Sequence, residues 1–223
     1  MNALAFFDVD NTLIQGDTQA MEAWFVLKQK KFAIKPVLCF FPVLAASVLA
    51  RAGRCSLCRQ NEIYLKTYTG RTRKSLAAQG RNLFDQVVSQ RFFNHMLARI
   101  QAHKQRGDVI VLVSAATRHL LTPLVAVIHP DDIFCTELEF DPQGRCLGQA
   151  LGKICIQERK KEIALFVARE KTLDLSASYA YSDHHSDIPL LACVGHPHAV
   201  KPTPKLKSHA LKNNWPVLEK KDL

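Results

Sequence analysis

Residues 5–13, AFFDVDNTL, place two carboxylates, Asp8 and Asp10, immediately after an apolar run. Similar short apolar runs recur, separated by segments of helical length, at 109–114 (VIVLVS), 177–182 (ASYAYS) and 196–200 (HPHAV). Short apolar strands that alternate with helices are typical of a parallel sheet covered on both faces. The sequence therefore predicts an α/β fold with a doubly wound parallel sheet, which binds its ligand beyond the carboxyl ends of the strands.

The gap between the first strand and the second is too long for a single crossover, and residues 17–90 within it read as helices only. We predict a core formed by residues 1–15 and 89–223, and an inserted all-helical cap at 16–88. Two smaller elements are expected in the core: a hairpin at 139–148, around a Pro-Gln-Gly turn, and a short helix in the terminal segment.

Within the predicted cap, residues 36–50 (PVLCFFPVLAASVLA) carry no charge and lie between Lys35 and Arg51. As a helix this stretch would span roughly 23 Å, short of the ~30 Å hydrocarbon core of a bilayer. Two interpretations stay open. The stretch is a helix that faces the core or a partner, or residues 36–51 make a peripheral contact with an acidic membrane.

The 223-residue chain is basic, with 30 Lys and Arg against 20 Asp and Glu, a formal charge of +10. This charge favours anionic partners: phosphorylated metabolites, acidic lipids or nucleic acid. Aromatic residues make up only 8% and no nucleic-acid-binding motif stands out, so we expect no nucleic acid. The N-terminus lacks signal-peptide features and the seven cysteines suit reduced thiols, which together predict a cytoplasmic protein. The sequence does not indicate an oligomeric state.

Polar residues follow the predicted strands where a ligand would bind. Asp8 and Asp10 can divide the work, because neighbouring like charges push two carboxyl pKa values apart. Ser114, at the end of the second strand, suits either a phosphate cradle or a helix cap. Asp183 and Asp187, four residues apart after a later strand, could join Asp8 in a hard-cation site. Lys160, in a lysine-rich run that also holds Lys153, could bind a phosphoryl group, although most such lysines are solvated.

These pieces, in this order, resemble the four motifs of the haloacid dehalogenase superfamily, and the helical insertion resembles its subfamily IB, which includes phosphoserine phosphatase. The resemblance implies that Asp8 attacks phosphorus to form an aspartyl-phosphate, and that Asp10 protonates the leaving oxygen and later activates water. It further implies Mg²⁺ held by Asp8, the Asp10 carbonyl and Asp183, with Asp187 in or behind that shell. Ser114 and Lys160 would bind the phosphoryl oxygens, and Lys160 is preferred to Lys153 by its place in the order of motifs.

Several residues depart from the phosphoserine phosphatase pattern or add to it. Ala115 and Ala116 follow Ser114 where those enzymes are glycine-rich, which puts specificity for phosphoserine in doubt. Asp17 stands where they carry a substrate-binding glutamate, and with Thr12 it is a candidate for the substrate pocket. His184 and His185 occupy a turn usually made of small residues. Either one, His184 above all, could contact substrate or metal, but an exposed pair is favoured.

Three functions follow. The leading hypothesis is a magnesium-dependent phosphomonoesterase for a small phosphorylated metabolite. The second is a membrane-associated lipid-phosphate phosphatase, because subfamily IB also contains phosphatidylglycerophosphate phosphatases with an apolar cap stretch similar to the one here. The third is a non-catalytic basic binding module on the same scaffold.

Overall fold

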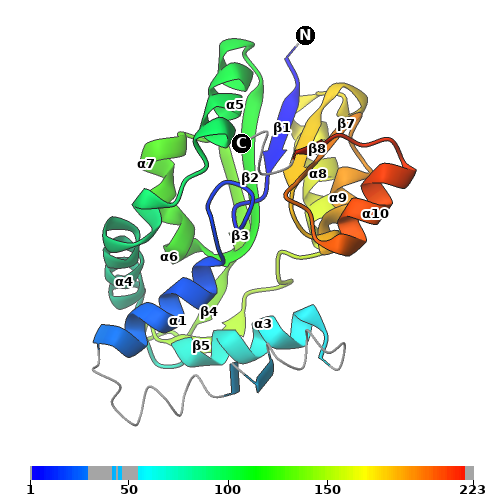
Figure 1. The fold of residues 1–223 in the computed structure, drawn as a ribbon. Coiled ribbons are helices and arrows are strands. Elements are labelled where there is room, and N and C mark those ends of the chain that lie inside the picture. The colour runs from blue at the N-terminus through cyan, green and yellow to red at the C-terminus, as the bar shows by residue number, and fades with distance from the viewer. Residues whose placement is uncertain (1, 30–41, 44, 47–54, 219–223) are drawn as a thin grey trace.

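The computed structural model describes residues 2–29, 42–43, 45–46 and 55–218 (Figure 1). A six-stranded sheet runs through it in the order β3-β2-β1-β6-β7-β8, and every neighbouring pair of strands is parallel. The strands are β1 (Leu4–Phe7), β2 (Val109–Thr117), β3 (Asp132–Thr136), β6 (Tyr179–Ser182), β7 (His196–Val200) and β8 (Val217–Leu218). The predicted parallel α/β fold is confirmed.

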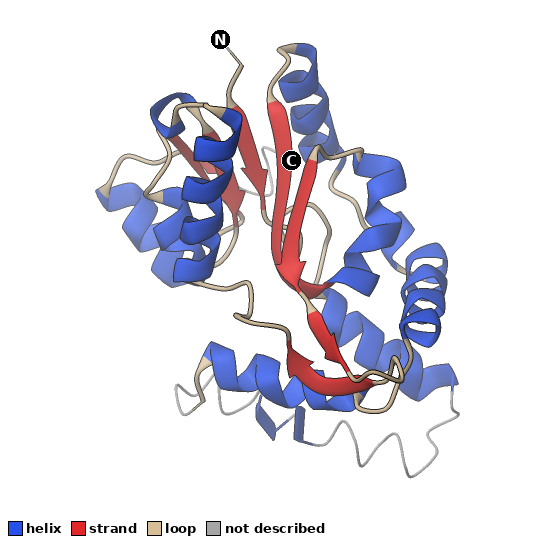
Figure 2. Cartoon of the chain, turned by 180° about the vertical axis from the view of Figure 1, so that it is seen from behind, coloured by secondary structure: helices blue, strands red, loops and turns tan. Residues whose placement is uncertain are grey.

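Helices cover both faces of the sheet (Figure 2). Side chains alternate along β1, so that Ala5 and Phe7 enter one core and Leu4 and Phe6 enter the other. The first core is closed by α4 (Arg73–Gln86), α5 (Asn94–Gln105), α6 (Arg118–Leu121) and α7 (Val125–Ile128), and the second by α8 (Glu158–Lys171), α9 (Ile188–Leu191) and α10 (Pro204–Lys212). Burial on both faces explains why β1 is entirely apolar.

The segment predicted as a cap is helical wherever the structure describes regular elements in it. These are α1 (Thr18–Gln29), α3 (Leu57–Leu65), a 3₁₀ turn (Lys66–Tyr68) and α4. The predicted hairpin is present as β4 (Leu138–Phe140) and β5 (Cys146–Ala150), and it packs against α3 and the 3₁₀ turn. The boundaries of the cap as a separate domain stay a prediction.

The apolar stretch at 36–50 falls outside the described residues except at 42, 43, 45 and 46. Both interpretations of it therefore stay predictions. Among the residues that the structure does describe, no helix has the length and apolar character needed to cross a bilayer.

Two strands were not predicted. β3 lies at one edge of the sheet, most of its residues are only half-buried, and its apolar run, residues 133–135, is only three residues long. β8 has two residues and follows α10, the terminal helix that the sequence does predict. Both strands extend the sheet at its edges and leave the central strands, which carry the candidate site, as predicted.

Candidate active site

A tight loop after β1 carries Asp8 and Asp10. Asp8 continues the sheet, since its backbone N–H donates to the Tyr181 carbonyl at 3.0 Å. The chain then turns back on itself, with the Leu13 and Ile14 N–H groups donating to the Val9 carbonyl. As a result, Asp8 is fixed by the strand, whereas Asp10 is placed by the turn.

Lys160 joins two of the candidate carboxylates. Its Nζ lies 2.7 Å from Oδ1 of Asp8 and 2.6 Å from Oδ2 of Asp187, and all three side chains are buried. Lys160 belongs to the first turn of α8, which delivers it beneath the end of β1. By contrast, Lys153 is exposed and pairs with Glu162 at 2.7 Å. The structure therefore places Lys160, and not Lys153, with Asp8.

The carboxylates in this cluster repel one another. Burial raises the pKa of Asp8 to about 6, with Lys160 lowering it and Asp187 raising it. Burial, together with Asp8 and Asp187, raises the pKa of Asp183 to about 8. Burial would lower the pKa of Lys160, but Asp187 and Asp8 outweigh it and raise that pKa. The cluster thus holds three acidic groups against one ammonium and favours a further cation or a proton.

Asp10 lies in a different environment from Asp8. Its carboxylate accepts hydrogen bonds from the Thr18 N–H at 2.8 Å and the Thr18 hydroxyl at 3.2 Å, at the first residue of α1. Burial and the charges of Asp17 and Asp8 raise the pKa of Asp10 well above its usual range. A raised pKa favours the protonated form, so Asp10 is the carboxyl group of this pair better suited to carry a proton.

Two further candidates lie close to these carboxylates in the chain. The Thr12 hydroxyl is buried and lies 3.3 Å from Oδ2 of Asp8, so Thr12 orients the Asp8 carboxylate. Asp17 is exposed and accepts a hydrogen bond from the Ala20 N–H at 2.8 Å. In the structure Asp17 therefore caps the start of α1.

Ser114 differs from the prediction in one respect. Its hydroxyl is buried and accepts a hydrogen bond from the Ala116 N–H at 3.1 Å, but β2 continues to Thr117 and α6 begins only at Arg118. The strand continues because the Thr136 hydroxyl of β3 donates to the Ala115 carbonyl at 2.7 Å. The expected junction between strand and helix at Ser114 is therefore wrong, and the helix that follows β2 begins four residues after this serine.

His184 and His185 do not form an exposed pair, which corrects that expectation. Both are half-buried, with ring centroids 4.1 Å apart. His184 Nδ1 accepts a hydrogen bond from the Ser186 N–H at 3.2 Å, which fixes the turn between Asp183 and Asp187. Burial, followed by the neighbouring His185, lowers the pKa of His184.

Sequence reasoning missed Ser182 and Thr18. The buried Ser182 hydroxyl donates to Oδ2 of Asp187 at 2.7 Å, and Thr18 holds Asp10 as described above. Ser182 directly precedes Asp183, and Thr18 is the first residue of the helix after the loop. Their positions in the sequence could therefore have identified both.

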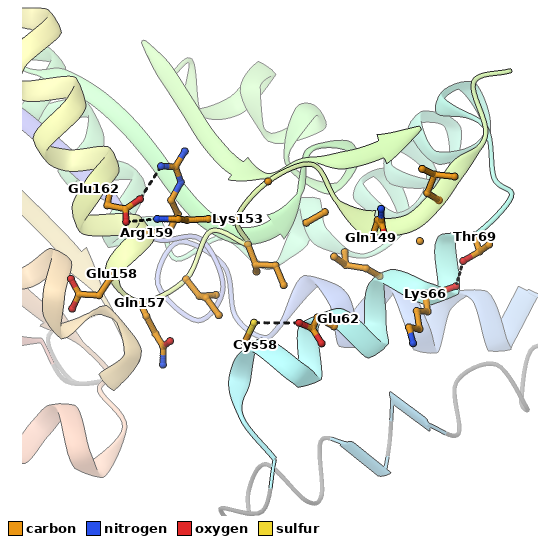
Figure 3. Close-up of a pocket in the computed structure, with 17 residues that line it drawn as sticks. Cys58, Glu62, Lys66, Thr69, Gln149, Lys153, Gln157, Glu158, Arg159 and Glu162 are labelled. Atoms are coloured by element: carbon orange, nitrogen blue, oxygen red, sulfur yellow. Dashed lines mark hydrogen bonds and ion pairs between the residues drawn. The ribbon is translucent and has the colours of Figure 1, made fainter. Parts of the chain in front are cut away.

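A cavity of about 800 Å³ lies between α3, β5 and the start of α8 (Figure 3). Cys58 and Glu62 line it from α3, and Gln157 and Glu158 line it from the start of α8. Among the described residues, its lining includes none of the four candidate aspartates. The cavity adjoins the helix that carries Lys160 without containing the carboxylate cluster.

Comparison with known proteins points to one family. The family model for haloacid dehalogenase-like hydrolases matches residues 5–192. A histidinol-phosphatase of Neisseria meningitidis is 29% identical over 230 residues, which cover 98% of this chain and 99% of the relative. A phosphoserine phosphatase of Mycobacterium tuberculosis is 26% identical over 218 residues, covering 97% of this chain and 70% of that protein.

Solved structures share the fold of this chain. A Bordetella pertussis protein of unknown function superposes with a TM-score of 0.87 at 25% identity, covering 98% of this chain and 99% of that one. A substrate-bound phosphoserine phosphatase superposes with a TM-score of 0.74 at 18% identity, covering 100% and 95%, and supports the fold alone. The chain belongs to the haloacid dehalogenase-like hydrolase family and is a phosphoserine phosphatase-like phosphatase.

Proposed function

We propose that the protein hydrolyses a small phosphorylated metabolite, with Asp8 as the nucleophile and Asp10 as the general acid and base. The observation that carries this proposal is the contrast between the two carboxylates. Asp8 is buried against the Lys160 ammonium, whereas Asp10 is hydrogen-bonded to Thr18 and has a pKa well above its usual range. One group is thus suited to attack and the other to carry a proton.

In the first step an Asp8 carboxylate oxygen attacks phosphorus, and the bond between phosphorus and the substrate's ester oxygen breaks. Asp10 gives its proton to that oxygen, which leaves as an alcohol. In the second step Asp10 takes a proton from water, whose oxygen attacks the phosphorus of the aspartyl-phosphate. This step releases phosphate and restores Asp8. Lys160 and Ser114 would contact the phosphoryl oxygens throughout.

The donor set fits Mg²⁺. The described residues contain no group of three or more His, Cys, Asp or Glu side chains arranged to hold a metal. Magnesium, however, keeps several waters and needs only one or two protein carboxylates besides substrate phosphate. Asp8 and Asp183, with the Asp10 carbonyl, would supply oxygen ligands, and burial together with the neighbouring carboxylates raises the pKa values of both aspartates. When bound, the ion would neutralise charge on the phosphoryl group.

Asp187 would stand behind this set of ligands. Its Oδ2 already accepts hydrogen bonds from Lys160 at 2.6 Å and Ser182 at 2.7 Å, and its Oδ1 lies 3.2 Å from the Ser186 hydroxyl. With both oxygens engaged, Asp187 is better suited to hold Lys160 in place than to bind a metal directly.

The relatives guide the choice of substrate. One acts as a phosphoserine phosphatase and another as a histidinol-phosphatase, and both are phosphatases of small amino compounds. We therefore place phosphoserine and histidinol phosphate first in the panel of candidates. Family membership favours the two catalytic hypotheses over the binding module.

The test is phosphate release with magnesium from a panel of phosphoserine, histidinol phosphate, sugar phosphates, nucleotides and phosphatidylglycerophosphate. The Asp8→Asn protein serves as the control, because it keeps the size of the side chain and loses the nucleophile. We expect turnover of a water-soluble monoester that the control loses. Turnover that survives in Asp8→Asn would refute the role of Asp8, and turnover of the lipid alone would favour the lipid-phosphate hypothesis.

A further inference from the structure

The buried face of α1 carries a carboxylate that the proposed mechanism does not use. Thr18, Glu22 and Phe25 follow helical spacing and are 1%, 1% and 7% exposed, so they form one inward stripe. A glutamate at such a position loses its hydration and is tolerated only when other groups replace the lost water. Both carboxylate oxygens of Glu22 have such hydrogen-bonding partners.

Four side chains point hydrogen-bonding groups at Glu22. The hydroxyls of Tyr64 and Tyr68 donate to Oε2, each at 2.5 Å, and His119 Nε2 lies 3.0 Å from Oε1. Gln79 Nε2 also donates to Oε1. Burial alone would raise the pKa of Glu22, but the bonds from His119 and the two tyrosines outweigh it and lower that pKa. The carboxylate is therefore ionised and fully paired.

These donors come from four different elements. Tyr64 belongs to α3, Tyr68 to the 3₁₀ turn, Gln79 to α4 and His119 to α6. The network therefore ties α1 to the other described helices of the insertion and to a helix that covers the sheet. A helix held at one point by four directed bonds cannot slide or rotate without breaking them.

The same helix face holds Asp10. Thr18 lies one turn before Glu22, and its N–H and hydroxyl are the two groups that hydrogen-bond the Asp10 carboxylate. A shift of α1 would therefore move both donors and turn that carboxylate. In catalysis, a misplacement of about 1 Å can cost on the order of 100-fold in rate.

We propose that Glu22 is a positioning residue for Asp10: its bonds to Tyr64, Tyr68, Gln79 and His119 lock α1, so that Thr18 aims the Asp10 carboxyl at the leaving oxygen. The inference rests on the proposed role of Asp10 as the general acid. It assigns Glu22 no contact with substrate. Its effect reaches the reaction only through Thr18 and Asp10.

The test compares two substrates that differ in their need for a proton. An alkyl monoester from the panel has a poor leaving group that needs a proton, whereas the p-nitrophenolate group of p-nitrophenyl phosphate leaves without protonation. The quantity to measure is kcat/KM, since it reports the first phosphoryl transfer. For Glu22→Gln we expect about a 10- to 100-fold fall on the alkyl ester and under about 3-fold on the aryl ester. Tyr68→Phe, which removes one donor and keeps the ring, should show a smaller fall with the same preference.

Two further variants make each outcome decisive. Ser178→Ala is the control. It removes a buried hydroxyl that accepts a hydrogen bond from the Leu4 N–H, at the ends of β1 and β6 that lie away from the candidate site. This variant should show no difference between the two substrates. Asp10→Asn should show the strongest selective loss, and adding Tyr68→Phe to it should cost nothing more. Equal losses on both substrates in Glu22→Gln and Tyr68→Phe, with a selective loss in Asp10→Asn, would overturn the positioning role alone. No selective loss in Asp10→Asn would instead overturn the proposed acid.

Discussion

Replacing Lys160 by methionine isolates the contribution of one buried ammonium. Methionine keeps a long, flexible apolar stem and removes only the charge and its two bonds, of 2.7 Å to Asp8 and 2.6 Å to Asp187. Removing one partner of a buried ion pair typically costs about 3–5 kcal/mol, because the other charge stays buried without compensation. For a chain of this size each kcal/mol shifts Tm by about 2–4 °C, so we expect Tm to fall by roughly 6–20 °C.

The loss should depend on pH in a defined direction. In the native protein Lys160 lowers the pKa of Asp8, which nevertheless stands at about 6, above its ordinary 3.8. Without Lys160 the pKa of Asp8 rises further. The folded variant therefore binds more protons than its unfolded state over a wider pH range than the native protein does. Stability then falls as pH rises through this range. The difference between Lys160→Met and the native protein should therefore be larger at pH 8 than at pH 5.

The assay is thermal unfolding at pH 5 and pH 8 with a chelator present, followed by phosphate release with magnesium. Lys153→Met is the matched control, because its pair with Glu162 is 2.7 Å long but exposed. Exposed pairs contribute about 0–1 kcal/mol, and Lys153 contacts none of the candidate carboxylates. The reasoning would be refuted if the two variants lost equal stability, or if Lys160→Met lost more at pH 5 than at pH 8.

Three further outcomes follow from the same geometry. With a chelator present, the native protein should lose stability as pH rises from about 4 to about 8. The reason is that the pKa values of Asp8 and Asp183 stand at about 6 and about 8 in the folded protein instead of 3.8. Calorimetry across this pH range checks the prediction, and a rise in Tm with pH would contradict it. Asp183→Asn should stabilise the metal-free protein at pH 8 by about 1–3 kcal/mol, which raises Tm by several degrees. The same variant should abolish the rise in Tm that added magnesium gives the native protein. Gly80→Ala should destabilise the protein by about 1–3 kcal/mol or more, since a Cβ there would meet the His119 carbonyl oxygen at 2.0 Å. Equilibrium denaturation measures this loss, and an unchanged midpoint would show that α4 and α6 can separate freely.

The parts of the fold that the sequence predicts are those with a strong local signal. β1, β2, β6 and β7 lie at or near the centre of the sheet, and most of their residues are buried, so they read as apolar runs. β3 escapes notice because four of its five residues are only half-buried, and β8 because it has two residues. Edge strands have fewer neighbours to cover them and carry weaker patterns.

The candidate site divides in the same way. Asp8 and Asp183 follow parallel strands whose ends share one edge of the sheet, which predicts that they lie close together. The resemblance to the family motifs adds Lys160, whose ammonium lies 2.7 Å from Asp8, whereas the place of Ser114 beside them stays a prediction. The surroundings of Glu22 could not be predicted. Its donors lie 42 to 97 residues away in sequence, and the periodicity of α1 shows only that the residue faces inward. The length of β2 likewise depends on a bond from Thr136, which no pattern near Ser114 reveals.

The central position of β1 also sets an order for folding during synthesis. This first strand pairs with β2, about 105 residues later, and with β6, about 174 residues later. At about 5–20 residues per second, the ribosome needs roughly 9–35 s after β1 to supply β6. During that interval β1, which is entirely apolar and is followed by Asp8, cannot pair with β6. We therefore expect slow folding, dominated by contacts distant in sequence, and a need for chaperones to shield β1 until the second half of the chain emerges.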